Sequence, residues 1–205
     1  MKVMKSLIDL IYPPRCLICQ GFLQDRNVMK SGQDLPFCQT CFDDFTEIKS
    51  PICSICGRPF SYGIELDRIC EDCIRKRPNF DFARAPYLYD GALMTAIHEL
   101  KYAQKSHLAD SLGYLLASFA QTWIGELKGY LIMPVPLHPR RLRSRGFNQS
   151  LLLARCVVSK TGAELDFLSL QRTRFTRPQT ELTSEERQRN VRKAFEVVKP
   201  EAVKG

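Results

Sequence analysis

Four short stretches decide how this chain begins to fold: CLIC at residues 16–19, CQTC at 38–41, CSIC at 53–56 and CEDC at 70–73. Two residues between cysteines let one tight turn aim both sulfurs at a single Zn²⁺, and two such turns complete a tetrahedron. We predict sequential pairing, first turn with second and third with fourth, because the intervals suit ribbon hairpins. A cross-braced pairing is the less favoured alternative. The predicted zinc ligands are Cys16, Cys19, Cys38, Cys41, Cys53, Cys56, Cys70 and Cys73.

Disulfides and a redox-active C-x-x-C motif are the alternatives for these cysteines. The first residues, MKVMKSLIDLIYPP, have a short apolar stretch broken by Asp9 and no small-residue cleavage site, unlike a secretory signal. We therefore expect a cytoplasmic protein, in which thiols stay reduced. A thioredoxin-type motif occurs once, whereas four such turns repeat here. Structural zinc is the favoured interpretation, and Cys156, within an apolar helical pattern, is expected to be a small buried residue.

The sequence pattern changes near residue 80 and predicts two domains, 1–80 and 81–205. The first combines an N-terminal helix, with Leu7 and Ile11 on its apolar side, and a double zinc ribbon. Because that region has few apolar clusters, metal binding and folding should be one event there. The second domain alternates strand and helix patterns, which is typical of an α/β fold. A hydrophobic content of 44% supports a core, and no apolar run is long enough for membrane insertion.

Strands of the second domain are expected at residues 82–89, 130–137, 165–170 and 194–198. A helix opened by Asn148 or Gln149 should end at Gly162. Thr183 with Glu186 predicts a capping box for a short helix.

The charge of the chain is concentrated in two basic segments. Each Zn(Cys)₄ unit carries a charge of −2, so two units lower the formal net charge of +8 to about +4. The remaining basicity lies in residues 140–145 and 172–193. Because guanidinium forks match phosphate geometry, both segments point to a phosphorylated ligand or a nucleic-acid backbone.

The segment PVPLHPRRLRSRGFNQS, residues 134–150, is predicted to be an anion-binding loop. A strand ends in prolines, four arginines follow, and a helix N-terminus arrives whose free N–H groups attract anions. In an open α/β sheet such a loop lies where ligands collect. His138 is interpreted either as a phosphate donor or as a turn-positioning residue, and a solvated basic loop is the alternative for the whole segment.

Three further strings, in order, complete a resemblance to the ComF family of competence proteins: HELKY (98–102), the 134–150 segment, and RTRFTRPQTELTSEERQRNVRKAF (172–195). The resemblance covers nearly the whole chain. It implies a double zinc ribbon followed by a type I phosphoribosyltransferase-like parallel sheet, phosphoribosyl pyrophosphate with Mg²⁺ as ligand, and a part in DNA uptake during natural transformation. It assigns no catalytic residue. The substrate-binding candidates are Lys101, His138, Arg140, Arg141, Arg143, Arg145, Asn148, Gln149, Arg187 and Asn190.

One departure from the family pattern limits the expected activity. Type I phosphoribosyltransferases have a strand ending in two acids followed by a Thr/Gly-rich loop, which holds the ribose and its 5-phosphate. No adjacent acids followed by T-T-G occur in residues 1–205. We therefore expect an incomplete phosphoribosyltransferase-like domain that is inactive alone. The alternative is a noncatalytic zinc-ribbon adapter that binds single-stranded DNA or competence proteins such as a helicase.

Overall fold

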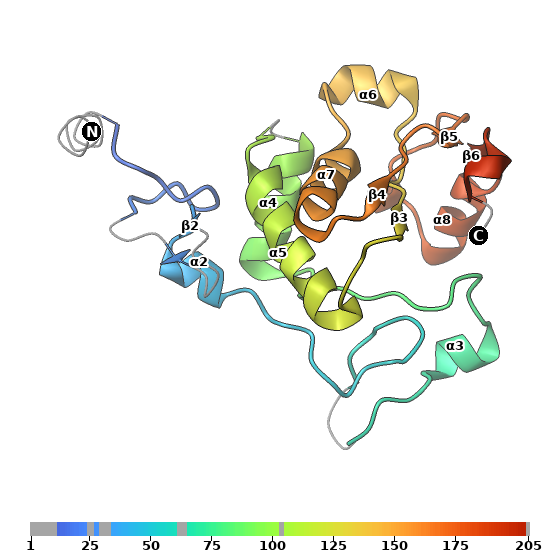
Figure 1. The fold of residues 1–205 in the computed structure, drawn as a ribbon, viewed down its shortest axis with the longest axis horizontal. Coiled ribbons are helices and arrows are strands. Elements are labelled where there is room, and N and C mark those ends of the chain that lie inside the picture. Colours follow the sequence, from blue (N-terminus) through green and yellow to red (C-terminus); the bar gives the residue numbers. More distant parts are fainter. Residues whose placement is uncertain (1–11, 24–26, 29–33, 61–64, 103–104, 204–205) are drawn as a thin grey trace. The chain divides into compact units, whose positions relative to one another are not determined.

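The computed structural model divides the chain into two compact units, Met1–Ile97 and His98–Gly205 (Figure 1). The described residues are 12–23, 27–28, 34–60, 65–102 and 105–203. The N-terminal helix expected around Leu7 lies outside them. Helix α4 (Gly91–Tyr102) carries the chain from one unit into the other. The expected domain boundary between residues 80 and 81 stays a prediction.

The first ribbon of unit 1 is built around a short antiparallel pair. Strand β1 (Asn27–Val28) pairs with β2 (Asp34–Leu35), and α2 (Gln39–Asp43) begins directly after Cys38. Phe37 is fully buried, and its ring lies 5.8 Å from that of Phe45. This apolar cluster is small, so burial alone stabilises the ribbon weakly.

In the described residues of the second ribbon, 50–60 and 65–75, isolated bridges occur in place of strands. Ile52 pairs with Pro59, and Cys53 pairs with Arg68. Helix α3 (Glu71–Arg75) then begins after Cys70. The core of this second ribbon is a buried cluster of Cys53, Ile55, Cys70 and Cys73. Phe60 packs against that cluster.

Asp44 fixes the start of helix α4 within unit 1. Its Oδ2 accepts a hydrogen bond from the Ala92 N–H at 2.6 Å, which satisfies one of the free donors of the first turn. Gly91 has φ +45°, and a Cβ there would lie 2.2 Å from Asp44 Oδ2. Glycine at this position therefore permits the contact.

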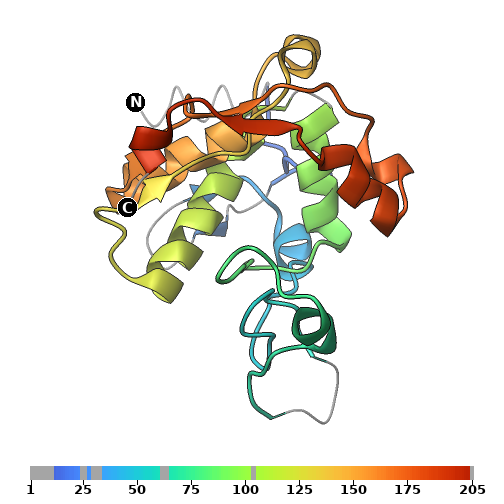
Figure 2. The ribbon, with the colours of Figure 1, turned by 90° about the vertical axis from the view of Figure 1, so that its right-hand side faces the viewer.

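Unit 2 is centred on two helices and a parallel strand pair. Helix α5 (Leu108–Ile124) packs along α7 (Gln149–Thr161), as both views show (Figures 1 and 2). Strand β3 (Leu131–Ile132) pairs in parallel with β4 (Glu164–Leu165). The crossover between these strands contains α6 (Pro139–Arg145) and α7, so its basic segment lies beyond the carboxyl end of β3.

The C-terminal part of unit 2 adds a second strand pair. Strand β5 (Leu170–Arg172) pairs antiparallel with β6 (Phe195–Val197). Helical segments lie on both sides of β6 along the chain (Figure 2). These segments are η1 (Gln179–Glu181), α8 (Ser184–Val191) and η2 (Pro200–Val203).

The predicted caps of α7 and α8 are confirmed. The Asn148 side chain accepts from the Ser150 N–H at the start of α7, and Gly162 ends that helix with φ +72°. Thr183 and Glu186 form the expected reciprocal capping box of α8. Each cap is a contact within a few residues, which is why the sequence reveals it.

Four local expectations are wrong. Residues 165–170 do not form one strand: β4 ends at Leu165 and β5 begins at Leu170, and between them Asp166 Oδ1 accepts from the N–H groups of Leu168 and Ser169. Residues 82–89 form no strand, only a bridge from Tyr87 to Glu47. Strand β3 spans two residues, since the prolines at 134 and 136 have no N–H to donate to a ladder. The arginine-rich segment is helix α6, not a loop, because Pro139 suits its first turn and Gly146, at φ +80°, ends it.

The architecture is therefore a zinc-ribbon module followed by a mixed unit with a small parallel pair. A phosphoribosyltransferase-like fold stays a prediction. Among the helices described, none has the length and apolar character needed to span a bilayer.

Candidate metal centres and anion-binding cavity

Each predicted cysteine tetrad is gathered into one cluster. The four Sγ atoms of Cys16, Cys19, Cys38 and Cys41 lie within 4.8 Å of one another, and so do those of Cys53, Cys56, Cys70 and Cys73. The sequential pairing is therefore confirmed and the cross-braced one is wrong. A tetrahedron with zinc–sulfur bonds of about 2.3 Å places sulfurs roughly 3.8 Å apart. The Cys19–Cys38 and Cys56–Cys70 distances of 3.6 and 3.7 Å fit that geometry.

Backbone N–H groups turn toward one sulfur in each tetrad. Cys53 Sγ accepts from the N–H groups of Cys70 at 3.3 Å and Cys56 at 3.5 Å. Burial alone raises the pKa of Cys53, but these donors outweigh it and lower the pKa to about 6. In the other tetrad, burial likewise raises the pKa of Cys16, and N–H groups including that of Ile18 bring it down to about 7. Thiolates of this kind are the form that binds zinc.

A cavity of about 530 Å³ in unit 2 brings several predicted binding residues together. Its walls come from the end of α4, the chain after β3, α6, the start of α7, β5 and η1. Among the described residues that line it, four are cationic and none is acidic. The lining residues are Lys101, Tyr102, Val135, Leu137, Arg141, Ser144, Arg145, Gln149, Ser150, Arg172, Pro178, Gln179 and Thr180. We call this the basic cavity.

Packing and hydrogen bonds hold the arginines of the basic cavity in place. The Arg145 guanidinium lies 5.0 Å from the centre of the Tyr102 ring, a cation–π contact. Arg141 donates to the Thr176 carbonyl at 3.1 Å, and Arg172 donates to the Thr176 hydroxyl. The Arg172 Nε is buried and has no hydrogen-bond partner. A buried donor left in this way is costly.

The crowding of positive charge perturbs two of these groups. Burial lowers the pKa of Lys101, and the nearby charge of Arg145 lowers it further. Burial also lowers the pKa of Arg172, followed by repulsion from Arg141 and Arg174. The cluster is therefore repulsive by itself, and an anion in the cavity would relieve that repulsion.

The other predicted binding residues lie outside this lining and hold the local structure. Asn148 donates to the Val135 carbonyl at 3.1 Å and caps α7. Asn190 donates to the Arg177 carbonyl, and Arg187 Nε donates to the carbonyls of Gln179 and Leu182. These three residues brace the chain around the cavity.

His138 caps α6: its Nδ1 accepts from the Arg140 N–H at 3.2 Å, which supports the turn-positioning interpretation. His138 and Arg140 both contact the half-exposed ring of Phe175, at centre distances of 5.4 and 4.9 Å. Arg143 is exposed and does not line the cavity.

Arg172 was absent from the predicted site. The only sign of it in the sequence is that it belongs to the second basic segment, residues 172–193. The sequence does not show that β5, which carries Arg172, lies at the cavity.

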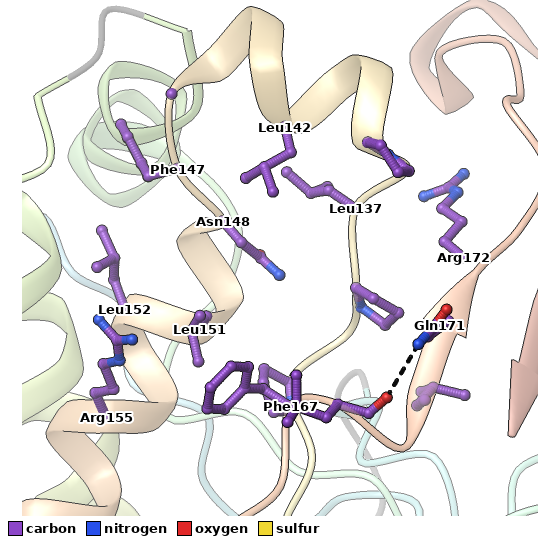
Figure 3. A pocket seen from close by; sticks show the side chains of 16 residues that line it. Leu137, Leu142, Phe147, Asn148, Leu151, Leu152, Arg155, Phe167, Gln171 and Arg172 are labelled. Carbon is purple, nitrogen blue, oxygen red and sulfur yellow. Dashed lines mark hydrogen bonds between the residues drawn. The ribbon is translucent and has the colours of Figure 1, made fainter. Parts of the chain in front are cut away.

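A second cavity of unit 2, about 460 Å³, is mainly apolar (Figure 3). Leu151 and Leu152 of α7 line one side, and Phe167 lies below them. Gln171 donates to the Leu168 carbonyl at its edge. Pro134 and Pro136 line this cavity whereas Val135 lines the basic one, since an extended chain turns alternate side chains to opposite faces.

Two cysteine tetrads, followed along the chain by a mixed helix and strand unit with an arginine-lined cavity, define a double zinc-ribbon protein with a second folded unit. A double zinc ribbon domain model matches residues 7–74. The DNA utilization protein YhgH of Escherichia coli (strain K12) is 31% identical over 166 residues, which are 80% of this chain and 71% of that protein.

Two competence proteins show the same likeness. Competence protein ComFC of Bacillus subtilis (strain 168) is 28% identical over 154 residues, covering 69% of this chain and 61% of that protein. Competence protein F of Haemophilus influenzae is 28% identical over 189 residues, which cover 88% of this chain and 75% of that protein. No solved structure matches this chain. The chain belongs to the ComF family.

Proposed function

We propose that the basic cavity binds the phosphate groups of phosphoribosyl pyrophosphate, and that the protein serves DNA uptake. The observation that carries the proposal is a lining of four cations without a carboxylate around about 530 Å³. Guanidinium groups suit phosphate oxygens. The names of the relatives, competence proteins and DNA utilization proteins, support the link to DNA.

Two parts of the proposal concern metals. The cysteine tetrads fit Zn²⁺, which would hold unit 1 folded. The basic cavity does not fit Mg²⁺ by itself, because Mg²⁺ prefers carboxylate ligands and none lines it. Mg²⁺ would therefore arrive only as the counterion of pyrophosphate. We limit the proposal to binding and expect no transferase turnover from residues 1–205.

Location and partners belong to the same proposal. A cytoplasmic location suits the eight zinc-binding thiols, which stay reduced there. A competence helicase or another DNA-processing protein is the proposed kind of partner for the zinc ribbons.

Calorimetric titration with phosphoribosyl pyrophosphate, with and without added Mg²⁺, tests the binding. Arg145→Ala removes a cation from the lining and should weaken binding by about 2 kcal/mol, roughly 30-fold in Kd. Arg143→Ala is the matched control, since it removes the same charge from the same helix but outside the lining. Equal losses in both variants, or no binding by the unmodified chain, would rule the proposal out.

A second function has its own observation. Phe175 is 44% exposed, and the guanidinium groups of Arg140 and Arg141 lie 4.9 and 5.6 Å from its ring centre. An aromatic ring beside cations is the usual surface for single-stranded DNA. This adapter role predicts an affinity for oligonucleotides that falls steeply with salt, and a loss of affinity in Phe175→Ala. Binding that is insensitive to both changes would exclude it.

A further inference from the structure

Lys101 is the one amine among the described residues that line the basic cavity. It lies in the last turn of α4 and is half-buried, whereas the other three cations of the lining are guanidinium groups. Guanidinium groups stay protonated at every physiological pH and do not act as nucleophiles. A lysine amine becomes a nucleophile once it loses its proton.

The charges around Lys101 favour its neutral form. Arg145, Arg141 and Arg172 share the cavity with it, and the walls contain no carboxylate in the part of the chain that the structure describes. The acid on the same helical turn, Glu99, instead pairs with Lys105 at 2.5 Å. Burial and the charge of Arg145 lower the pKa of Lys101. Desolvation beside another cation is a recognised way to activate an amine that attacks a carbonyl.

The uncharged polar groups of the lining indicate what kind of molecule would bring that carbonyl. Among the described residues that line the cavity, four carry hydroxyls and two carry amides: Tyr102, Ser144, Ser150, Thr180, Gln149 and Gln179. Hydroxyls and amides match the alcohol groups of a sugar, and guanidinium groups match a phosphate. A phosphorylated sugar satisfies both sets of groups at once.

We propose that Lys101 forms an imine with the C1 aldehyde of an open-chain pentose 5-phosphate held in the basic cavity. This inference rests on the proposed phosphate site but concerns a different ligand, since phosphoribosyl pyrophosphate has no free aldehyde. The Lys101 ammonium first gives a proton to water. The neutral amine adds to C1, and the carbinolamine loses one water as the C=N bond forms. No oxidant or reductant is consumed.

Such an aldehyde has two sources with the same chemistry. One is free ribose 5-phosphate after ring opening. The other is an abasic site in single-stranded DNA, where a deoxyribose keeps its 5-phosphate and exposes C1. The test therefore needs one arm for each source.

Trapping with sodium cyanoborohydride converts the imine into a stable amine. The zinc-loaded 205-residue chain is incubated with ribose 5-phosphate, with ribose, or with a single-stranded oligonucleotide that contains one abasic site. Intact mass should increase by the mass of the sugar phosphate or oligonucleotide less one oxygen, and peptide mapping should place the adduct on Lys101. We expect labelling of Lys101 at least ten-fold faster than that of Lys105, and suppression by inorganic phosphate.

Two matched variants make the result specific. Lys101→Arg keeps the charge but has no nucleophilic amine, so its adduct should disappear. Lys105→Arg makes the same change four residues away, at a lysine paired with Glu99, and should leave labelling unchanged. Zinc content and circular dichroism check that both variants fold.

Each outcome separates this inference from the proposed function. An adduct at Lys101 with ribose 5-phosphate alone supports the free sugar, and one with the oligonucleotide alone supports abasic DNA. No adduct, or equal labelling of Lys101 and Lys105, overturns the inference even if phosphoribosyl pyrophosphate binds. Equal labelling by ribose and ribose 5-phosphate overturns the phosphate requirement. Absence of phosphoribosyl pyrophosphate binding, with trapping intact, defeats only the proposed function.

Discussion

Gly57 lets the second zinc ribbon close, and replacing it should weaken one metal site selectively. Gly57 follows the third C-x-x-C turn with φ +71°, and its N–H donates to the Cys53 carbonyl at 2.9 Å. A Cβ there would lie 2.5 Å from the Ala83 carbonyl oxygen. The Ala83 backbone has little freedom to withdraw, because its own N–H donates to the Ile55 carbonyl at 2.7 Å.

The expected cost of Gly57→Ala has two parts. A left-handed conformation costs a non-glycine residue about 1–2 kcal/mol. Relief of the overlap would break the hydrogen bond from Ala83 to Ile55, worth about 1 kcal/mol. The sum, about 2–3 kcal/mol, corresponds to roughly 30- to 150-fold weaker zinc binding, because folding and metal binding are coupled.

Competition with a chromophoric chelator measures this change. The unmodified chain should release two zinc ions, and Gly57→Ala should release one of them at a much lower chelator concentration. The first site serves as an internal reference. Gly21→Ala is the matched control, since a Cβ there meets only Cys19 Sγ at an ordinary 3.4 Å. Indistinguishable release from Gly57→Ala and the unmodified chain would refute the reasoning.

Two further substitutions test side-chain contacts at the starts of helices. Asp44→Ala removes the acceptor for the Ala92 N–H and should destabilise the start of α4 by about 1 kcal/mol. Amide hydrogen exchange at Ala92 should become faster, and unchanged exchange there would contradict the cap. Asn148→Ala removes both the cap of α7 and the bond to the Val135 carbonyl, and should lower the free energy of unfolding in urea by about 2 kcal/mol. Asn148→Asp, which keeps the cap but not the bond to Val135, should recover part of that loss. Equal stability of the two variants would count against the cap, and full recovery in Asn148→Asp would count against the bond to Val135.

The zinc sites were predictable because their geometry is local. A C-x-x-C turn fixes two sulfurs within four residues, and hairpin intervals then bring neighbouring turns together, as the tetrads of Cys16 and Cys53 confirm. The caps at Asn148 and Thr183 follow the same logic. The length of β3 was predicted wrongly. The expected strand extended past Pro134, but hydrogen-bonded pairing with β4 stops before this proline.

The binding cavity could be predicted only in part. The sequence does not distinguish the four arginines of residues 140–145 as cavity residues, and we predicted that the segment is a loop. In the structure it is helix α6, so Arg141 and Arg145, one turn apart, reach the basic cavity together. Arg143 lies on another side of the same helix. A helical interpretation of the segment would have separated them.

The sequence by itself determined the metal chemistry, because eight sulfurs at two-residue spacing admit few arrangements within short loops. The tertiary structure alone decided which cations share one cavity, since Lys101, Arg141 and Arg172 come from three elements far apart in the chain. Their meeting depends on the packing of α5 against α7 and on where β5 pairs with β6. Long-range packing of this kind is the sum of many weak contacts, and no short motif encodes it.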